Sequence, residues 1–105
     1  MKALLGIYEE AWKRWGARNQ RAMLAEECCE LAQAALKQDR LFNGRSVDSL
    51  CEEIADVELL IESVCHNQHL RERVDQWRQK KIARLINILR TPDALSKSPG
   101  EASEG

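Results

Sequence analysis

The chain has 105 residues, with 16 basic and 17 acidic side chains and a formal net charge of −1 at pH 7. This length supports one hydrophobic core and not two, and a net charge near zero argues against a bulk nucleic-acid or membrane-surface binder. Because no apolar run approaches the ~18 residues that span a bilayer and the N-terminus lacks a signal-peptide pattern, we expect a cytoplasmic protein without membrane or nucleic-acid polymer partners.

The spacing of apolar residues predicts helices from the N-terminus onward. The first helix is expected over residues 2–15 and is ended by Gly16. A second helix is expected over residues 20–39, with Asn19 as its N-cap. Both segments contain few β-branched residues and no proline, which favours long helices.

A third helix is predicted after the turn signal Asn43-Gly44. Ser46 is the expected N-cap, and the helix should continue to Cys65. The segment HNQH at 66–69 is expected to form a short polar connection. Its two histidines are interpreted as surface residues, because two ligands without a nearby cysteine or acid rarely hold zinc.

A fourth helix is predicted over residues 70–90, and Thr91-Pro92 should end it. The short connections between helices favour antiparallel neighbours. The predicted fold class is therefore all-α: an antiparallel bundle of about four helices over residues 1–90. Residues 91–105, rich in Ser, Pro, Gly and Glu, are expected to form a disordered tail.

The two central helices carry an acidic repeat. LAEECCEL at 24–31 returns 26 positions later as LCEEIADV at 50–57. On a helical wheel, at ~100° per residue, the repeat puts one acid of each helix inside the apolar arc and another at its margin. A carboxylate removed from water costs several kcal/mol unless it is paired, so this arrangement predicts a bound cation. The four expected ligands are Glu27, Glu30, Glu53 and Asp56.

The composition of this ligand set indicates which cation it holds. Oxygen ligands without an interleaved histidine suit Mg²⁺ first and Mn²⁺ second. A di-iron bundle would need Glu-x-x-His motifs, whereas Glu30 and Asp56 occupy the corresponding positions here. The alternative is a solvated acidic face. That alternative suits Glu26 and Glu52 better, since both point away from the leucines.

The fourth predicted helix offers positive charge. Lys81 falls among the apolar positions of that helix, and Arg84 lies at the edge of the same arc. The lysine either extends past the core to solvent, or it reaches the acidic cluster itself or an anion that a metal in this cluster holds. The four cysteines have no CxxC spacing, so we interpret them as structural or incidental thiols.

These motifs resemble the MazG-like all-α nucleoside triphosphate pyrophosphohydrolases. The resemblance is carried by EECCE at 26–30 and EIAD at 53–56, which match the EExxE and ExxD motifs of that family. It extends to WGARNQRAMLAEECCELAQAALK at 15–37, EEIADVELLIE at 52–62 and DQWRQKKIARL at 75–85. The likeness therefore covers roughly residues 15–89.

The resemblance implies a function and a set of roles. Such enzymes use Mg²⁺ to cleave a nucleoside triphosphate into the monophosphate and pyrophosphate, and they are usually homodimers or dimers of dimers. It implies that Glu27, Glu30, Glu53 and Asp56 bind the metal, whereas Lys81 and Arg84 face the phosphates. Apart from the resemblance, Glu26 or another carboxylate of the acidic repeat is expected to accept the proton of the attacking water. No residue that would recognise the nucleobase can be identified, so the sequence does not indicate which nucleobase the substrate carries.

Two other functions remain open from the residues alone. One is a non-catalytic helical module that dimerises or binds a nucleotide without turnover. The other is a carboxylate di-metal bundle for iron or manganese, which the missing histidines disfavour. A nucleoside triphosphate pyrophosphohydrolase is the preferred hypothesis, because it accounts for both the acidic repeat and the basic pair.

Overall fold

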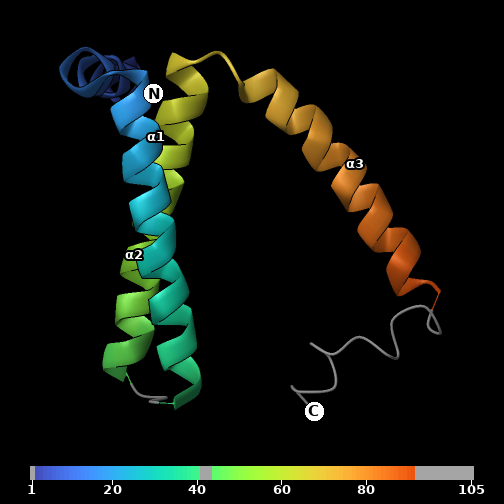
Figure 1. Ribbon diagram of the computed structural model, residues 1–105. Helices are drawn as coiled ribbons and strands as arrows, with labels where there is room; N and C mark the ends of the chain where they lie inside the picture. The colour runs from blue at the N-terminus through green and yellow to red at the C-terminus, as the bar shows by residue number, and fades with distance from the viewer. Residues whose placement is uncertain (1, 41–43, 92–105) are drawn as a thin grey trace. The chain divides into compact units, whose positions relative to one another are not determined.

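The computed structural model describes residues 2–40 and 44–91, and every regular element in this part of the chain is a helix. The helices are α1 (Lys2–Arg40), α2 (Gly44–Asn67) and α3 (Arg71–Leu89) (Figure 1). The expected all-α fold class is therefore confirmed. The chain divides into two compact units, of which the first ends at Leu70 and the second begins at Arg71.

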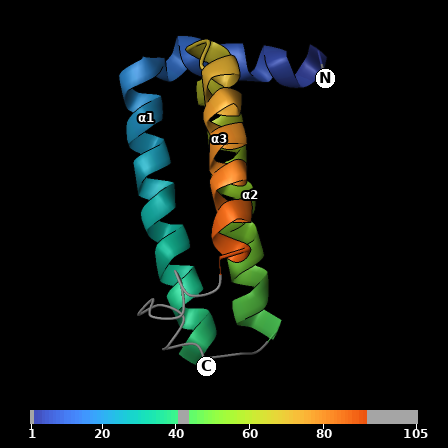
Figure 2. The same ribbon diagram turned by 90° about the vertical axis from the view of Figure 1, so that its right-hand side faces the viewer.

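The α1 helix contains a sharp bend at Gly16. This residue has φ 78° and ψ 168°, a backbone conformation that is nearly restricted to glycine. The residues before Gly16 consequently run across the direction of the rest of α1 (Figure 2). The described residues therefore form three helices, whereas about four were expected. The first expected helix should have ended at Gly16, and α1 instead bends at this residue and continues.

Asn19 does not act as the predicted N-cap, because it lies inside α1. Its side-chain amide instead donates a hydrogen bond to the backbone oxygen of Trp15, at 2.8 Å. A bend leaves carbonyl groups without their usual helical partners, and this bond satisfies one of them. The asparagine therefore supports the bend from its C-terminal side.

The second part of α1 packs antiparallel to α2, as both ribbon views show (Figures 1 and 2). The apolar core between α1, including its N-terminal part, and α2 is small. Its buried members are Tyr8, Ala34, Val57, Val64 and Cys65. The other three cysteines are exposed, and all four are free thiols.

Buried polar groups fix the register of the two helices. Gln20 is only 1% exposed, and its Nε2 donates to the Oγ of Ser63 at 3.2 Å. The Nδ2 of Asn67 donates to the Oε1 of Gln20, also at 3.2 Å. Because a buried amide without partners is costly, sliding one helix along the other by a turn would be opposed by these bonds.

The N-terminal part of α1 is attached to the last turns of α2. The hydroxyl of Tyr8 donates to Glu62, and Asn67 donates to the backbone oxygen of Tyr8 at 2.9 Å. The Nε2 of His66 lies 3.2 Å from a carboxylate oxygen of Glu9. The bond to Glu62, together with burial, raises the pKa of Tyr8 to about 12.

The ends of α2 differ from the prediction. The helix begins at Gly44, two residues before the expected cap Ser46, and includes His66 and Asn67, which were expected in a connection. It ends in a Schellman motif, in which Leu70 N donates to Cys65 O at 2.9 Å and His69 has φ 55°. Histidine thus occupies a position where glycine is usual, and this explains why the end was hard to predict.

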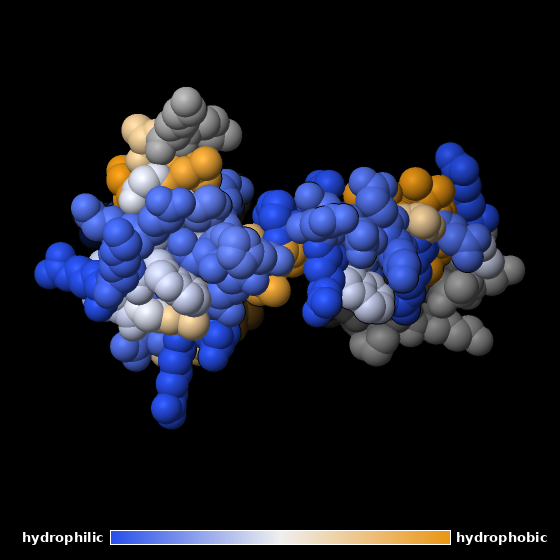
Figure 3. Space-filling model, turned by 90° about the horizontal axis from the view of Figure 1, so that it is seen from above, coloured by the Kyte–Doolittle hydropathy of each residue, from blue (hydrophilic) through white to orange (hydrophobic). Residues whose placement is uncertain are grey.

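The second unit consists of α3 and the residues after it. None of the residues of α3 is buried, and the helix ends at Leu89, close to the predicted end. Figure 3 shows hydrophobic side chains at the surface beside hydrophilic ones. The large apolar side chains of α3 that are exposed are Val74, Trp77, Ile82, Leu85, Ile86 and Leu89. The predicted disordered tail from Pro92 on lies outside the described residues.

No described helix is long and apolar enough to cross a membrane.

Candidate functional site

Three carboxylates meet between α1 and α2. Glu27 and Glu30 are three positions apart on α1, so they lie on one side of that helix. Glu53 comes from the facing side of α2. One oxygen from each of the three carboxylates lies within 4.8 Å of the other two. This group, called the acidic cluster below, contains three of the four metal ligands predicted from the sequence.

Two members of the acidic cluster carry buried oxygens without hydrogen-bond partners. These atoms are Oε2 of Glu27 and Oε2 of Glu53, whereas both side chains as wholes are half-buried. Buried polar atoms in native proteins nearly always have a partner, which can be an ion. A hard cation fits this donor set, because Mg²⁺ prefers carboxylate oxygens.

The electrostatics of the acidic cluster also favour a cation. Burial, hydrogen bonding to Glu30 and the charges of Glu30, Asp56 and Glu53 raise the pKa of Glu27 to about 7. Burial and the charges of Glu30 and Asp56 likewise raise the pKa of Glu53, although a hydrogen bond to Glu27 opposes this. The carboxylates therefore repel each other when ionised, and a divalent cation among them would remove that repulsion.

The remaining predicted site residues lie in different surroundings. Asp56 is half-buried one turn after Glu53, and its charge acts on the cluster although it is not one of the three close carboxylates. Glu26 is exposed on α1. Lys81 and Arg84 are exposed on α3, in the second compact unit. The structure thus brings together Glu27, Glu30 and Glu53.

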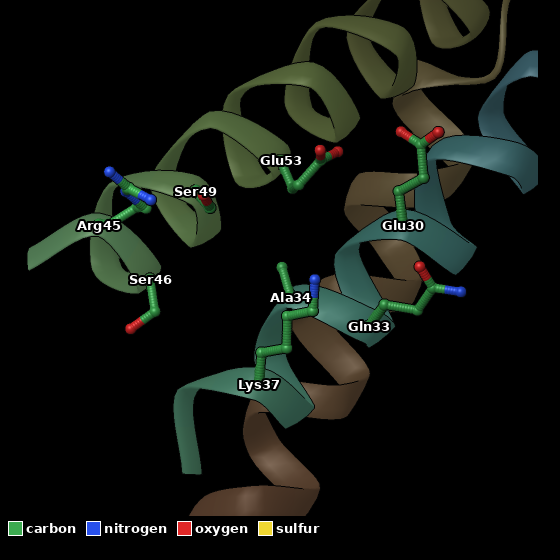
Figure 4. A pocket seen from close by; sticks show the side chains of 8 residues that line it. All are labelled: Glu30, Gln33, Ala34, Lys37, Arg45, Ser46, Ser49 and Glu53. Atoms are coloured by element: carbon green, nitrogen blue, oxygen red, sulfur yellow. The ribbon is translucent and has the colours of Figure 1, made fainter. Parts of the chain in front are cut away.

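A cavity of about 460 Å³ begins at the acidic cluster and lies between α1 and the first turns of α2. Figure 4 shows the carboxylates of Glu30 and Glu53 at one end of it and Lys37 with Ser46 at the other. The volume falls in the usual range of small-molecule sites. The lining residues are Glu30, Gln33, Ala34, Lys37, Arg45, Ser46, Ser49 and Glu53.

The basic side of this cavity was not predicted from the sequence. The spacing carries a signal for it, because Lys37 follows Glu30 by seven positions and Arg45 precedes Glu53 by eight. Each basic residue therefore lies about two turns along its own helix from an acid of the cavity, rotated around the helix by ~20° for Lys37 and ~80° for Arg45. The site thus combines an acidic end, suited to a cation, with a basic side, suited to an anion.

No family model, no curated protein and no solved structure matches this chain. The function must consequently be argued from the residues and their geometry. The strongest features are the two partnerless oxygens of Glu27 and Glu53 and the cavity of mixed charge beside them.

Proposed function

We propose that this chain is a Mg²⁺-dependent nucleoside triphosphate pyrophosphohydrolase, which cleaves a (d)NTP to the (d)NMP and pyrophosphate. The observation that carries the proposal is the acidic cluster, with partnerless buried oxygens on Glu27 and Glu53, at the end of a cavity that also presents basic side chains. The resemblance of the EExxE and ExxD motifs to MazG-like enzymes supports it.

The residues of the acidic cluster would hold the metal, with Asp56 as the fourth ligand. Bound there, Mg²⁺ would supply positive charge to phosphate oxygens and lower the pKa of a water molecule. Mn²⁺ has a similar preference for oxygen ligands. The raised pKa of Glu27 supports this role, because a divalent ion would reduce the repulsion among the carboxylates.

The reaction adds one water molecule across the bond between the α-phosphorus and the oxygen that bridges to the β-phosphate. Water attacks the α-phosphorus in line, the bridging bond breaks, and pyrophosphate leaves with the bridging oxygen. Glu26, which is exposed on α1, or another carboxylate of the acidic cluster is proposed to accept the water proton. Lys81 and Arg84 are proposed to neutralise the charge that gathers on the phosphate oxygens.

The assay for this function measures pyrophosphate released from a panel of canonical and modified (d)NTPs with Mg²⁺. We expect the Glu53→Gln variant to lose about 100-fold or more of the activity, because a bound metal ion contributes several kcal/mol to the transition state. Glu58→Gln is the matched control, since Glu58 is an exposed acid on the same helix; it should keep the wild-type rate.

Two results would contradict the proposal. One is equal activity of the wild type and Glu53→Gln. The other is an absence of pyrophosphate release by the wild type over the whole panel, which would favour the non-catalytic helical module. The exposed apolar side chains of α3 make that module the second candidate, because they are suited to an interface between subunits.

A further inference from the structure

The basic side of the cavity has donors that are available to a ligand. Lys37 comes from the last turns of α1, and Arg45 comes from the first turn of α2. Neither forms an ion pair with a described residue. Because both line one cavity, an anion bound there would contact positive charge from both helices.

The other lining groups indicate the chemistry of this anion. The hydroxyl group of Ser49 and the amide of Gln33 add hydrogen-bond donors to the wall. The described lining contains no aromatic side chain on which a nucleobase could stack. Ammonium, guanidinium and hydroxyl donors together are typical of phosphate recognition.

The two ends of the cavity are well separated along the helices. Residues 30 and 37 are two turns apart on α1, which corresponds to about 10 Å along the axis. The cavity between these positions therefore has room for more than the one phosphate that contacts a metal at the acidic cluster. Lys37 and Arg45 are placed for phosphates further along a chain that begins at the metal.

From this geometry we propose that Lys37 and Arg45 bind the β- and γ-phosphates of the substrate, which leave as pyrophosphate. The α-phosphate then lies at the acidic cluster, and the nucleoside lies outside this cavity. The inference rests on the proposed function for the direction of the substrate. Its consequence is that the length of the phosphate chain contributes to the selection of the substrate.

The experiment measures binding of inorganic pyrophosphate in the presence of Mg²⁺ by calorimetry, and binding of Mg²⁺ alone in a second titration. The variants are Lys37→Gln and Arg45→Gln. Each should weaken pyrophosphate binding by about 10-fold or more, since a hydrogen bond to a charged group contributes roughly 1.5–3 kcal/mol. Mg²⁺ binding should stay at the wild-type value.

Control variants separate a specific contact from a general effect of charge. Arg18→Gln removes an exposed positive charge from α1, outside the cavity, and should bind pyrophosphate like the wild type. Lys37→Arg keeps the charge and should retain most of the affinity. Circular dichroism of each variant confirms that the helices are formed.

The outcomes distinguish this inference from the proposed function. Wild-type pyrophosphate affinity in both Lys37→Gln and Arg45→Gln overturns the inference, whereas nucleotide hydrolysis that depends on Glu53 would still support the enzyme. Loss of Mg²⁺ affinity in the same variants also overturns it, because the basic residues would then act on the metal site. Selective loss of pyrophosphate binding without any hydrolysis by the wild type supports the polyphosphate subsite and refutes the enzyme.

Discussion

Glu27 is a carboxylate whose surroundings favour its protonated form, since partial burial and three neighbouring acids raise its pKa to about 7. We predict that Glu27→Gln increases the melting temperature at pH 8 without divalent ions, because it removes one of the repelling charges. Mg²⁺ should raise the melting temperature of the wild type and have a much smaller effect on the variant. Thermal unfolding followed by circular dichroism measures both.

The pH dependence of this effect has a definite sign. The folded pKa of Glu27 lies above its usual value of 4.5, so the proton that it binds stabilises the fold below pH 4.5, and this contribution is lost as the pH rises to about 7. The increase in melting temperature that Glu27→Gln causes without metal should therefore become smaller from pH 8 to pH 5. A constant difference between the two proteins over this range would contradict the electrostatic explanation.

The acidic side of the site could be predicted from the sequence, whereas the basic side could not. Glu27 and Glu53 stand out because a carboxylate within an apolar arc is unusual. Lys37 and Arg45 resemble the many other basic residues of a chain in which Asp, Glu, Lys and Arg make up 31%. Only the structure, in which α1 packs against α2, shows that both residues line one cavity.

Gly16 determines the course of α1 through its backbone conformation. Its φ of 78° is unfavourable for any residue with a Cβ, although no atom lies within 4 Å of the position that a Cβ would take. We predict that Gly16→Ala lowers the free energy of unfolding by about 1–3 kcal/mol. Chemical denaturation with urea measures this loss.

Gly6 provides the matched control for Gly16, because it lies in the same helix, with open space around it and no positive φ. Gly6→Ala should stabilise the protein by roughly 0.5–1 kcal/mol, as expected for a glycine in the interior of a helix. If both substitutions had the same sign, the bend at Gly16 would not be the conformation in solution.

The helices were predictable from their apolar periodicity, but their ends were not. The Schellman motif after α2 places His69 at a left-handed position, and no residue type in HNQH indicates this. Asn19 has the residue type of a helix cap and instead bonds to Trp15 across the bend. An asparagine side chain can cap the start of a helix or bond to a carbonyl group that precedes it, and the backbone conformation determines which of the two occurs.

The second unit, taken by itself, exposes large apolar side chains. Trp77 is 56% exposed and Leu85 is 54% exposed, although both are large apolar residues. Apolar surfaces of this kind commonly mark interfaces. We therefore predict that the protein forms a homodimer or a dimer of dimers, with a mass at least twice the 12.0 kDa of one chain in analytical ultracentrifugation.

A double variant tests the contribution of α3 to this assembly. Trp77→Ser combined with Leu85→Ser should shift the protein toward the monomer. Leu59→Ser is the control, since Leu59 is exposed to a similar degree on α2, and it should leave the mass unchanged. Sedimentation of the wild type as a monomer at micromolar concentrations would contradict the prediction.

The bonds from Tyr8 and Asn67 have a consequence for the carboxylates near the middle of α1 and α2. The helix pair is joined at one end by the short link between residues 40 and 44, and at the other by the bent N-terminal segment. Closure at both ends resists spreading of Glu27 and Glu53 under their own repulsion. The carboxylates of the acidic cluster are thus held in place, so the proposed cation would meet a site that needs little rearrangement.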